Sequence, residues 1–172
     1  MELNTLSALL LFLAERASGY DIRLLFKATP LAVFSDSPGA IYPALARLEA
    51  RGLLASEAAG GRRRRVYFRT EAGNAALDSW LRAPVDPEIT ARRPHEHELR
   101  YVILANRLGR AAGAAFLTAC AESLRARIAE LEAFGVGHPE IGEIGAEALT
   151  LGIQLFRTRL AWCVDIAEKG GE

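Results

Sequence analysis

The amino-acid sequence predicts a mainly α-helical protein with one small β-hairpin, divided into two parts. Apolar residues make up 51% of the 172 residues and recur at helical spacing along most of the chain. The period changes once, between residues 53 and 69, to the alternation typical of a short hairpin. Three prolines within residues 83–94 then separate this first part from a second part that is helical throughout.

Two helices are predicted at the start of the chain. Leucines at helical spacing indicate a first helix that ends near Ser18 and Gly19. Ser18 offers an N-cap with Asp21 three residues on, which is a helix start signal, and the second helix runs to about Ala28. The leucines of the first helix are Leu6, Leu9, Leu10 and Leu13.

A third helix is predicted to begin at Ser37, which serves as N-cap before a proline at the first helical position. It ends at Gly52, a residue suited to the left-handed conformation that follows a helix. Ile41, Leu45 and Leu48 fall on one narrow arc of this helix, so they are expected to face the core.

After the third helix, residues 53–59 and 65–69 are predicted to form the two strands of the hairpin around a turn at Gly60-Gly61. The alternation assigns the second strand's side chains to two faces, with Val66 and Phe68 inward, and Tyr67 and Arg69 outward. Thr70 is expected to cap a fourth helix. Three helices, a hairpin and a helix in this order make a winged helix-turn-helix, with the hairpin as its wing.

The domain organisation follows from this pattern. Residues 1–82 form the winged helix-turn-helix, residues 83–94 form a linker, and residues 95–172 form a helical domain. Three helices are expected in the last part, over about 96–108, around 117–131, and from Pro139 to about Lys169. Cys120 and Cys163 lie among apolar neighbours, which indicates core thiols in a reducing compartment.

Composition and motifs exclude several classes of protein. No apolar run is long enough for a membrane span and no secretory signal is recognisable, so a cytoplasmic protein is expected. No motif for catalysis, cofactor or metal binding is present, so neither an enzyme nor a cofactor or metal protein is expected. His95-Glu96-His97-Glu98 places its imidazoles on different sides of a helix, which indicates a solvated helix start.

The outer face of the third helix points to nucleic acid. Opposite its apolar arc lie small residues near the N-terminus and arginines toward the C-terminus. Small residues let the backbone approach a surface closely, and arginines reach base edges or phosphates. An ordinary solvated helix face is the alternative for this segment.

Four adjacent arginines at the tip of the wing, Arg62 to Arg65, strengthen this interpretation. Their charges repel one another in the isolated protein, whereas a polyanion neutralises them and releases counterions. The net charge of zero divides into +3 over residues 1–82 and −3 over residues 83–172. A solvated hairpin tip that protects a sheet edge is the alternative.

At this point the sequence resembles a known family. Residues 37–54, Ser-Pro-Gly-Ala-Ile-Tyr-Pro-Ala-Leu-Ala-Arg-Leu-Glu-Ala-Arg-Gly-Leu-Leu, resemble the recognition-helix signature of the PadR family of bacterial transcriptional regulators. Residues 19–22, Gly-Tyr-Asp-Ile, are similar to the family's opening of the second helix, and residues 67–73 to the exit from its wing. The three blocks lie in order within the first 80 residues.

The resemblance implies roles for individual residues. It places Gly39, Ala40 and Pro43 toward the bases, Arg47 at the groove wall, and Tyr42 beside the phosphates. Pro43 stays within the helix, although a proline there would otherwise predict a break. Ala40 stands where many members have a hydroxyl, so one base contact is expected to be missing. The DNA-binding residues are therefore expected to be Tyr20, Ser37, Gly39, Ala40, Tyr42, Pro43, Arg47, Arg51, Arg62, Arg63, Arg64 and Arg65.

The last helix carries two apolar stripes and only a narrow polar arc, which indicates that it buries two sides. One side is expected to pack on its own chain and the other on a second copy, as the resemblance to the family's longer architecture also implies. The stripe assigned to this dimer consists of Leu149, Ile153, Phe156, Leu160 and Val164. A compact monomer with a central last helix is the alternative.

These observations predict a homodimeric, sequence-specific DNA-binding regulator that reads a palindromic operator in double-stranded DNA. Repression, and response to a small-molecule effector, follow from the resemblance alone. Trp80 and Trp162 are more simply explained as core residues than as the border of an effector cavity. The rival functions are a winged helix that binds a protein instead of DNA, and a ligand-binding protein without regulation.

Overall fold

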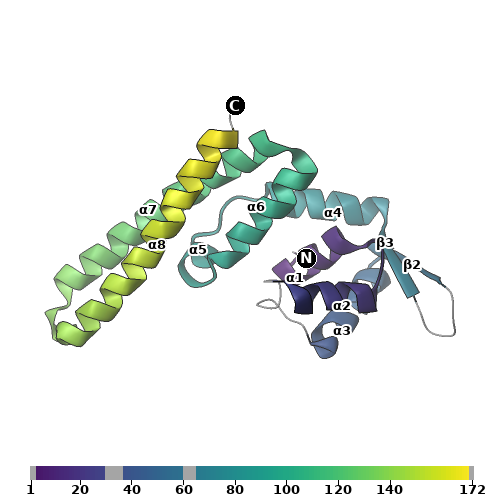
Figure 1. Ribbon diagram of the computed structural model, residues 1–172, viewed down its shortest axis with the longest axis horizontal. Helices are drawn as coiled ribbons and strands as arrows, with labels where there is room; N and C mark the ends of the chain where they lie inside the picture. The colour runs from purple at the N-terminus through teal and green to yellow at the C-terminus, as the bar shows by residue number, and fades with distance from the viewer. Residues whose placement is uncertain (1–2, 30–36, 60–64, 171–172) are drawn as a thin grey trace. The chain divides into compact units, whose positions relative to one another are not determined.

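The computed structural model describes residues 3–29, 37–59 and 65–170, and these residues form one short sheet, eight α-helices and one 3₁₀ helix. The chain divides into two compact units, residues 1–83 and 84–172 (Figure 1). Unit 1 contains, in order, α1 (Thr5–Leu13), β1 (Glu15–Ser18), α2 (Gly19–Ala28), α3 (Pro38–Ala50), β2 (Leu54–Ala58), β3 (Arg65–Arg69) and α4 (Glu71–Arg82). The mainly helical fold class is confirmed, with a three-stranded antiparallel sheet in place of a two-stranded hairpin.

The predicted helix starts of unit 1 are confirmed by their caps. Ser18 Oγ accepts from the Asp21 N–H at 3.2 Å while the Asp21 carboxylate accepts from the Ser18 N–H, which completes a capping box. Ser37 Oγ accepts from the Gly39 N–H, and Thr70 Oγ1 accepts from the Gly73 N–H. These caps fix where α2, α3 and α4 begin.

The prediction that the first helix continues to Ser18 is wrong, because α1 ends at Leu13. Ala14 leaves the helical conformation, and its carbonyl accepts from the Arg69 N–H at 3.2 Å. The next four residues pair with β3 as strand β1, with a bulge where Arg16 adopts a φ of 61°. Residues 15–18 have little intrinsic preference for a strand, so tertiary pairing decides their conformation.

The predicted faces of the second hairpin strand are also wrong. β3 lies in the middle of the sheet, in the order β1-β3-β2. Tyr67 is buried and the Arg69 side chain is only 11% exposed, whereas Val66 and Phe68 are half-buried. The Arg69 guanidinium finds hydrogen-bond partners within the unit, so the alternation of apolar and polar residues assigns the wrong face.

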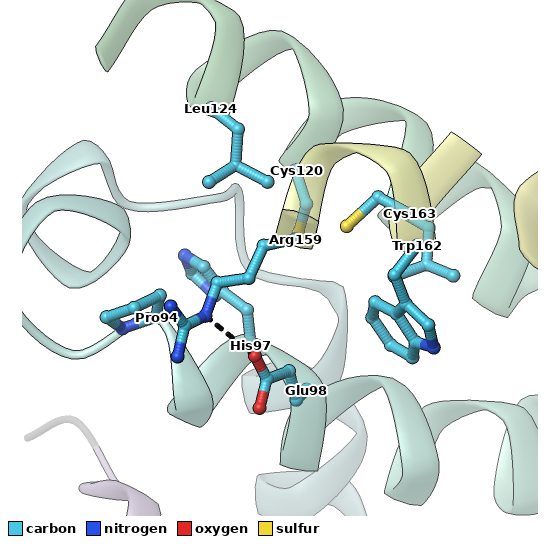
Figure 2. A pocket seen from close by; sticks show the side chains of 9 residues that line it. Pro94, His97, Glu98, Cys120, Leu124, Arg159, Trp162 and Cys163 are labelled. Carbon is cyan, nitrogen blue, oxygen red and sulfur yellow. Dashed lines mark hydrogen bonds and ion pairs between the residues drawn. The ribbon is translucent and has the colours of Figure 1, made fainter. Parts of the chain in front are cut away.

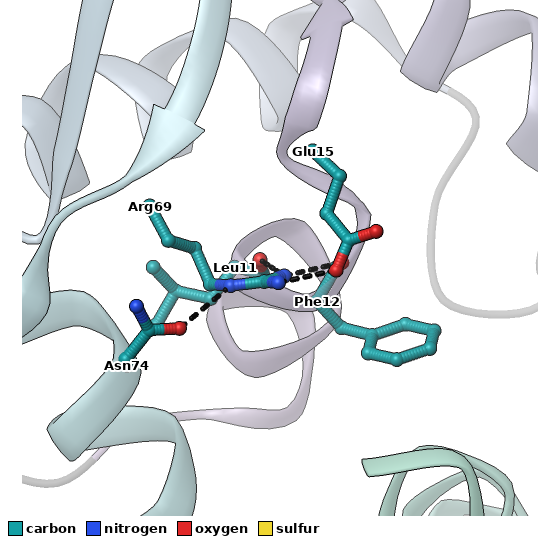
Figure 3. A network of polar contacts seen from close by, with 5 residues as sticks. All are labelled: Leu11, Phe12, Glu15, Arg69 and Asn74. Atoms are coloured by element: carbon teal, nitrogen blue, oxygen red, sulfur yellow. Dashed lines mark hydrogen bonds and ion pairs between the residues drawn. The ribbon is translucent and has the colours of Figure 1, made fainter.

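Arg69 joins four elements of unit 1 (Figure 3). Its Nη1 donates to the carbonyls of Leu11 at 2.8 Å and Phe12 at 2.7 Å, which lie in the last turn of α1. Its Nε donates to Asn74 Oδ1 on α4 at 3.0 Å, and its Nη2 donates to the Glu15 carboxylate on β1. One guanidinium on β3 therefore satisfies helix-end carbonyls that have no partner within α1.

Only glycine fits at residue 73, the last position of the motif of residues 67–73, for a steric reason. A Cβ on Gly73 would lie 2.0 Å from the Leu53 carbonyl oxygen, so no side chain fits there. This close approach lets Thr70 Oγ1 donate to the Gly52 carbonyl at 2.6 Å and the Thr70 N–H donate to Leu53. The wing is thereby tied to the end of α3.

Unit 2 contains α5 (Pro87–Arg92), α6 (His95–Leu108), α7 (Arg110–Gly137), the short 3₁₀ helix η2 (Pro139–Ile141) and α8 (Gly142–Gly170). The interpretation of residues 83–94 as a linker needs correction, because they contain α5. Asp86 Oδ1 accepts from the Glu88 N–H as its N-cap, and Thr90 on this helix is buried. The helices expected in the second part are confirmed.

The long helices α7 and α8 lie side by side in unit 2 (Figure 1). Cys120 on α7 and Cys163 on α8 are both buried free thiols. Burial raises the pKa of Cys120 to about 12 and that of Cys163 to about 11, so both are protonated at neutral pH. None of the helices in the described residues has the length and apolarity that a membrane crossing requires.

The start of α6 is not solvated as predicted, because Glu96 and His97 are both buried. His97 Nε2 lies 3.0 Å from Thr90 Oγ1, which in turn accepts from Ser123 Oγ at 2.9 Å. The His97 ring also packs edge-on against Phe116. Burial, and secondarily the Arg100 guanidinium, lower the pKa of His97 below its ordinary value.

Replacing the shared guanidinium should destabilise unit 1. We expect Arg69→Met to lower the free energy of unfolding by about 2–4 kcal/mol, because it leaves buried carbonyls without donors. Arg16→Met is the matched control, since the Arg16–Glu57 ion pair on the same sheet is exposed and should contribute less than about 1 kcal/mol. Urea denaturation measures both, and equal losses would contradict the role given to Arg69.

The buried imidazole should make unit 2 sensitive to acid. Because the folded-state pKa of His97 lies below the unfolded value, its contribution to stability is complete above the unfolded pKa of about 6.5 and is lost as pH falls through the folded pKa. Denaturation of the wild type between pH 7.5 and 5 should show a larger loss than His97→Gln. His95→Gln should keep the wild-type dependence; if it flattens the profile equally, the assignment to His97 fails.

Candidate nucleic-acid interface

Helix α3 has one buried and one exposed side, as predicted. Ile41, Leu45 and Leu48 are buried, and Ala44 joins them. On the other side Gly39, Tyr42, Pro43, Arg47 and Arg51 are exposed and Ala40 is half-buried. Most of the side chains that the sequence assigns to DNA on this helix therefore reach the surface of unit 1.

The first turns of α3 present polar backbone groups on this exposed side. Pro43 remains inside the helix and has no N–H to donate to the Gly39 carbonyl four residues before it. Gly39 itself is exposed. The N-terminal end of α3 adds peptide N–H groups, whose partial positive charge favours an anion.

Tyr42 is held in place by the glycine at the start of α2. A Cβ on Gly19 would lie 2.6 Å from Tyr42 Cε1, so the ring occupies the space that a side chain at residue 19 would need. Tyr42 nevertheless remains 41% exposed, and Tyr20 is 59% exposed. Gly19 thus leaves room for the Tyr42 ring, and the next residue, Tyr20, is exposed on the surface.

The wing is joined to α3 through an acidic residue. Glu49 is the one acidic residue of α3, and its Oε1 accepts from Ser56 Oγ on β2 at 2.7 Å and from Arg65 Nη2 on β3 at 2.8 Å. The Arg65 guanidinium also lies 6.0 Å from the ring of Tyr67, whose pKa is raised by burial. Arg65 is therefore paired within the protein, while Arg62, Arg63 and Arg64 lie outside the described residues.

Sequence reasoning missed this ion pair and the one between Arg16 and Glu57, whose atoms lie 2.8 Å apart. Arg16 on β1 and Glu57 on β2 lie on the two outer strands, with β3 between them, so direct cross-strand pairing gives no sign of their contact. Arg65 opposite Ala58 in the sheet gives no such sign, because its partner comes from the helix. The Glu49 contact depends on how the wing folds back on α3.

In unit 2, the stripe assigned to dimerisation is half-buried along its whole length. Leu149 packs against α7, where a Cβ on Gly135 would lie 2.8 Å from Leu149 Cδ2. The second apolar stripe of α8 consists of Leu151, Leu155, Trp162 and Ile166. The most exposed large apolar residues of α8 lie outside the stripe that begins at Leu149, and they are Ile144 at 84%, Leu151 at 58% and Leu155 at 51%.

The second stripe of α8 also borders an apolar groove of about 450 Å³, lined by Glu98, Leu155, Thr158, Arg159 and Trp162. A much smaller cavity of about 10 Å³ shares Glu98, Arg159 and Trp162 with this groove and has Cys120 and Cys163 in its wall (Figure 2). Arg159 Nε donates to Glu98 Oε1 at 2.9 Å, and Trp162 packs edge-on against Tyr101. No group of three or more side chains in the described part of the chain is arranged to hold a metal ion.

Comparisons with known proteins agree with this geometry in the first unit. Residues 9–79 match the Transcriptional regulator PadR-like family. Transcriptional regulator Rv3488 of Mycobacterium tuberculosis is 59% identical over 49 residues, which make up 27% of this chain. The match spans about half (46%) of the length of that protein.

Solved structures of two Bacillus proteins were found by structural comparison, with TM-scores between 0.40 and 0.43. Bacillus subtilis PadR in complex with operator DNA is 21% identical, with a TM-score of 0.43 over 97% of this chain and 99% of that one. The PadR-like transcriptional regulator BC1756 from Bacillus cereus is 22% identical, with a TM-score of 0.41 over 98% of each chain. Bacillus subtilis PadR in complex with p-coumaric acid is 21% identical, with a TM-score of 0.40 over 98% of this chain and 96% of that one.

The family match covers the elements that carry the exposed face of α3, the capping box of α2 and the wing strands. The family is described as one of transcriptional regulators. Over residues 9–79 this chain is similar to the Transcriptional regulator PadR-like family.

Proposed function

We propose that this protein is a sequence-specific DNA-binding repressor that acts as a homodimer in the cytoplasm. The observation that carries the proposal is the exposed face of α3, where small residues, Tyr42 and two arginines lie on the surface of a helix whose opposite face is buried. The match of residues 9–79 to a family of transcriptional regulators supports it.

In this proposal α3 enters the major groove of DNA. Gly39, Ala40 and Pro43 bring the helix backbone close to the bases, and the Gly39 carbonyl, which receives no N–H from Pro43, accepts from an exocyclic amino group of cytosine or adenine. Arg47 and Arg51 reach base edges or the groove wall, and Ser37, Tyr20 and Tyr42 flank the phosphates. Arg62, Arg63 and Arg64 of the wing neutralise further phosphates.

Two copies are needed because a palindrome presents two half-sites about one helical turn apart. We propose that α8 forms the dimer, through the stripe that begins at Leu149 together with the stripe that contains Leu151 and Leu155. The exposure of Leu151 and Leu155 favours the second stripe as the larger contribution, since burying the exposed half of two leucines contributes about 1.5–3 kcal/mol.

The groove beside Trp162 is the proposed place for a small-molecule effector. Its wall combines an aromatic ring and Leu155 with the charged pair of Arg159 and Glu98, so it suits a small molecule with an apolar body and one polar end. A ligand there would contact α6 and α8 together and could change the position of one helix relative to the other.

Removing one arginine from α3 should weaken specific DNA binding. We expect Arg47→Ala to reduce affinity for a selected duplex about 10- to 100-fold, because a base or groove contact is lost. Arg82→Ala makes the same charge change at the exposed end of α4 and should alter affinity less than about twofold. Fluorescence anisotropy measures both.

Binding of both variants with wild-type affinity would contradict the role of α3. If the wild type shows no preference for any duplex while it captures a protein partner through the same face, the protein-interaction function replaces the proposed one.

Changing the exposed stripe of α8 should dissociate the dimer. We expect Leu155→Glu to weaken self-association about 100-fold or more, because it places two charges in an apolar interface. Gln154→Glu adds the same charge at the neighbouring exposed position and should leave association within about threefold of wild type. Sedimentation velocity over a concentration series measures this, and a wild type that stays monomeric excludes the dimer.

A further inference from the structure

We propose that Glu49 determines DNA specificity by withholding Arg65 from the phosphate backbone while it fixes the base of the wing against α3. The inference rests on the proposed function, since it concerns how the DNA-binding unit discriminates among duplexes. It assigns a role to a carboxylate that lies within a surface otherwise rich in arginine.

The contacts of Glu49 show both parts of this role. One carboxylate oxygen, Oε1, accepts from Ser56 Oγ at 2.7 Å and from Arg65 Nη2 at 2.8 Å. The first contact joins α3 to β2, and the second joins it to β3. A single side chain thus joins the recognition helix to both strands of the wing.

Burial makes this pair more persistent than an ordinary surface ion pair. The Glu49 side chain is only 25% exposed, while Arg65 is 57% exposed. Because it is half-buried, the Glu49 carboxylate is poorly hydrated and depends on Arg65 to compensate its charge. Glu49 therefore competes strongly with DNA phosphates for the Arg65 guanidinium. The ring of Tyr67 beneath the guanidinium further favours the bound position.

The consequence concerns the balance between specific and non-specific binding. A free arginine at the root of the wing would bind any phosphate and would raise affinity for all duplexes equally. Phosphate contacts position a protein on DNA without reading its sequence. Pairing of Arg65 with Glu49 removes one such contact and leaves discrimination to the exposed face of α3.

The test compares Glu49→Gln with wild type by anisotropy on a selected and a scrambled duplex, from about 50 to 300 mM salt. Glutamine keeps a hydrogen-bond acceptor for Ser56 but gives up the charge that holds Arg65. We expect the log–log salt slope to steepen by about 0.9, affinity for the scrambled duplex to rise about three- to tenfold, and the ratio of specific to non-specific affinity to fall.

Two further variants separate this from a general charge effect. Glu57→Gln makes the same charge change on the same sheet, at the partner of Arg16, and should not steepen the slope. The double variant with Glu49→Gln and Arg65→Ala should return the slope to the wild-type value. A steeper slope in the double variant or in Glu57→Gln overturns the assignment.

A purely structural role for Glu49 predicts another result. Glu49→Gln would then weaken binding to both duplexes alike, with an unchanged salt slope, and this outcome also overturns the proposal. Failure of the wild type to bind DNA is a separate outcome, because it overturns the proposed function before any variant is compared.

Discussion

The arrangement of unit 1 depends on the guanidinium of Arg69. Helix α1 must stop at Leu13 so that the chain can pair with β3 as β1, and stopping it leaves carbonyls without helical partners. Arg69 supplies donors to two of them and at the same time reaches α4 and β1. Because β3 is also the central strand, the contacts of this one side chain hold both α1 and α4 against the sheet.

The orientation of the exposed face of α3 is set by the contacts that α3 makes with the rest of unit 1. Gly73 lets the chain after the wing pass close to the Leu53 carbonyl, and Gly19 leaves room for the Tyr42 ring. Glu49 then connects the helix to both wing strands. The surface proposed to contact DNA is therefore held in place by close packing at two glycines and by the ion pair of Glu49, while its own side chains remain exposed.

Much of this organisation is predictable from sequence because it depends on local chemistry. The caps at Ser18, Ser37 and Thr70, and the apolar arc of α3, follow from spacing alone. Strand β1, the inward side chain of Arg69 and the burial of His97 do not, because each depends on a partner far away in the chain. For the site, exposure of the α3 residues was foreseeable, whereas the pairing of Arg65 with Glu49 was not.

The central claim is that two α3 helices read one DNA site together, and selection of bound duplexes from a random pool by the full chain tests it most directly. The account predicts enrichment of a palindrome whose half-sites have centres about 10 base pairs apart. Recovery of no common sequence, or of a single half-site without a symmetric partner, would contradict it.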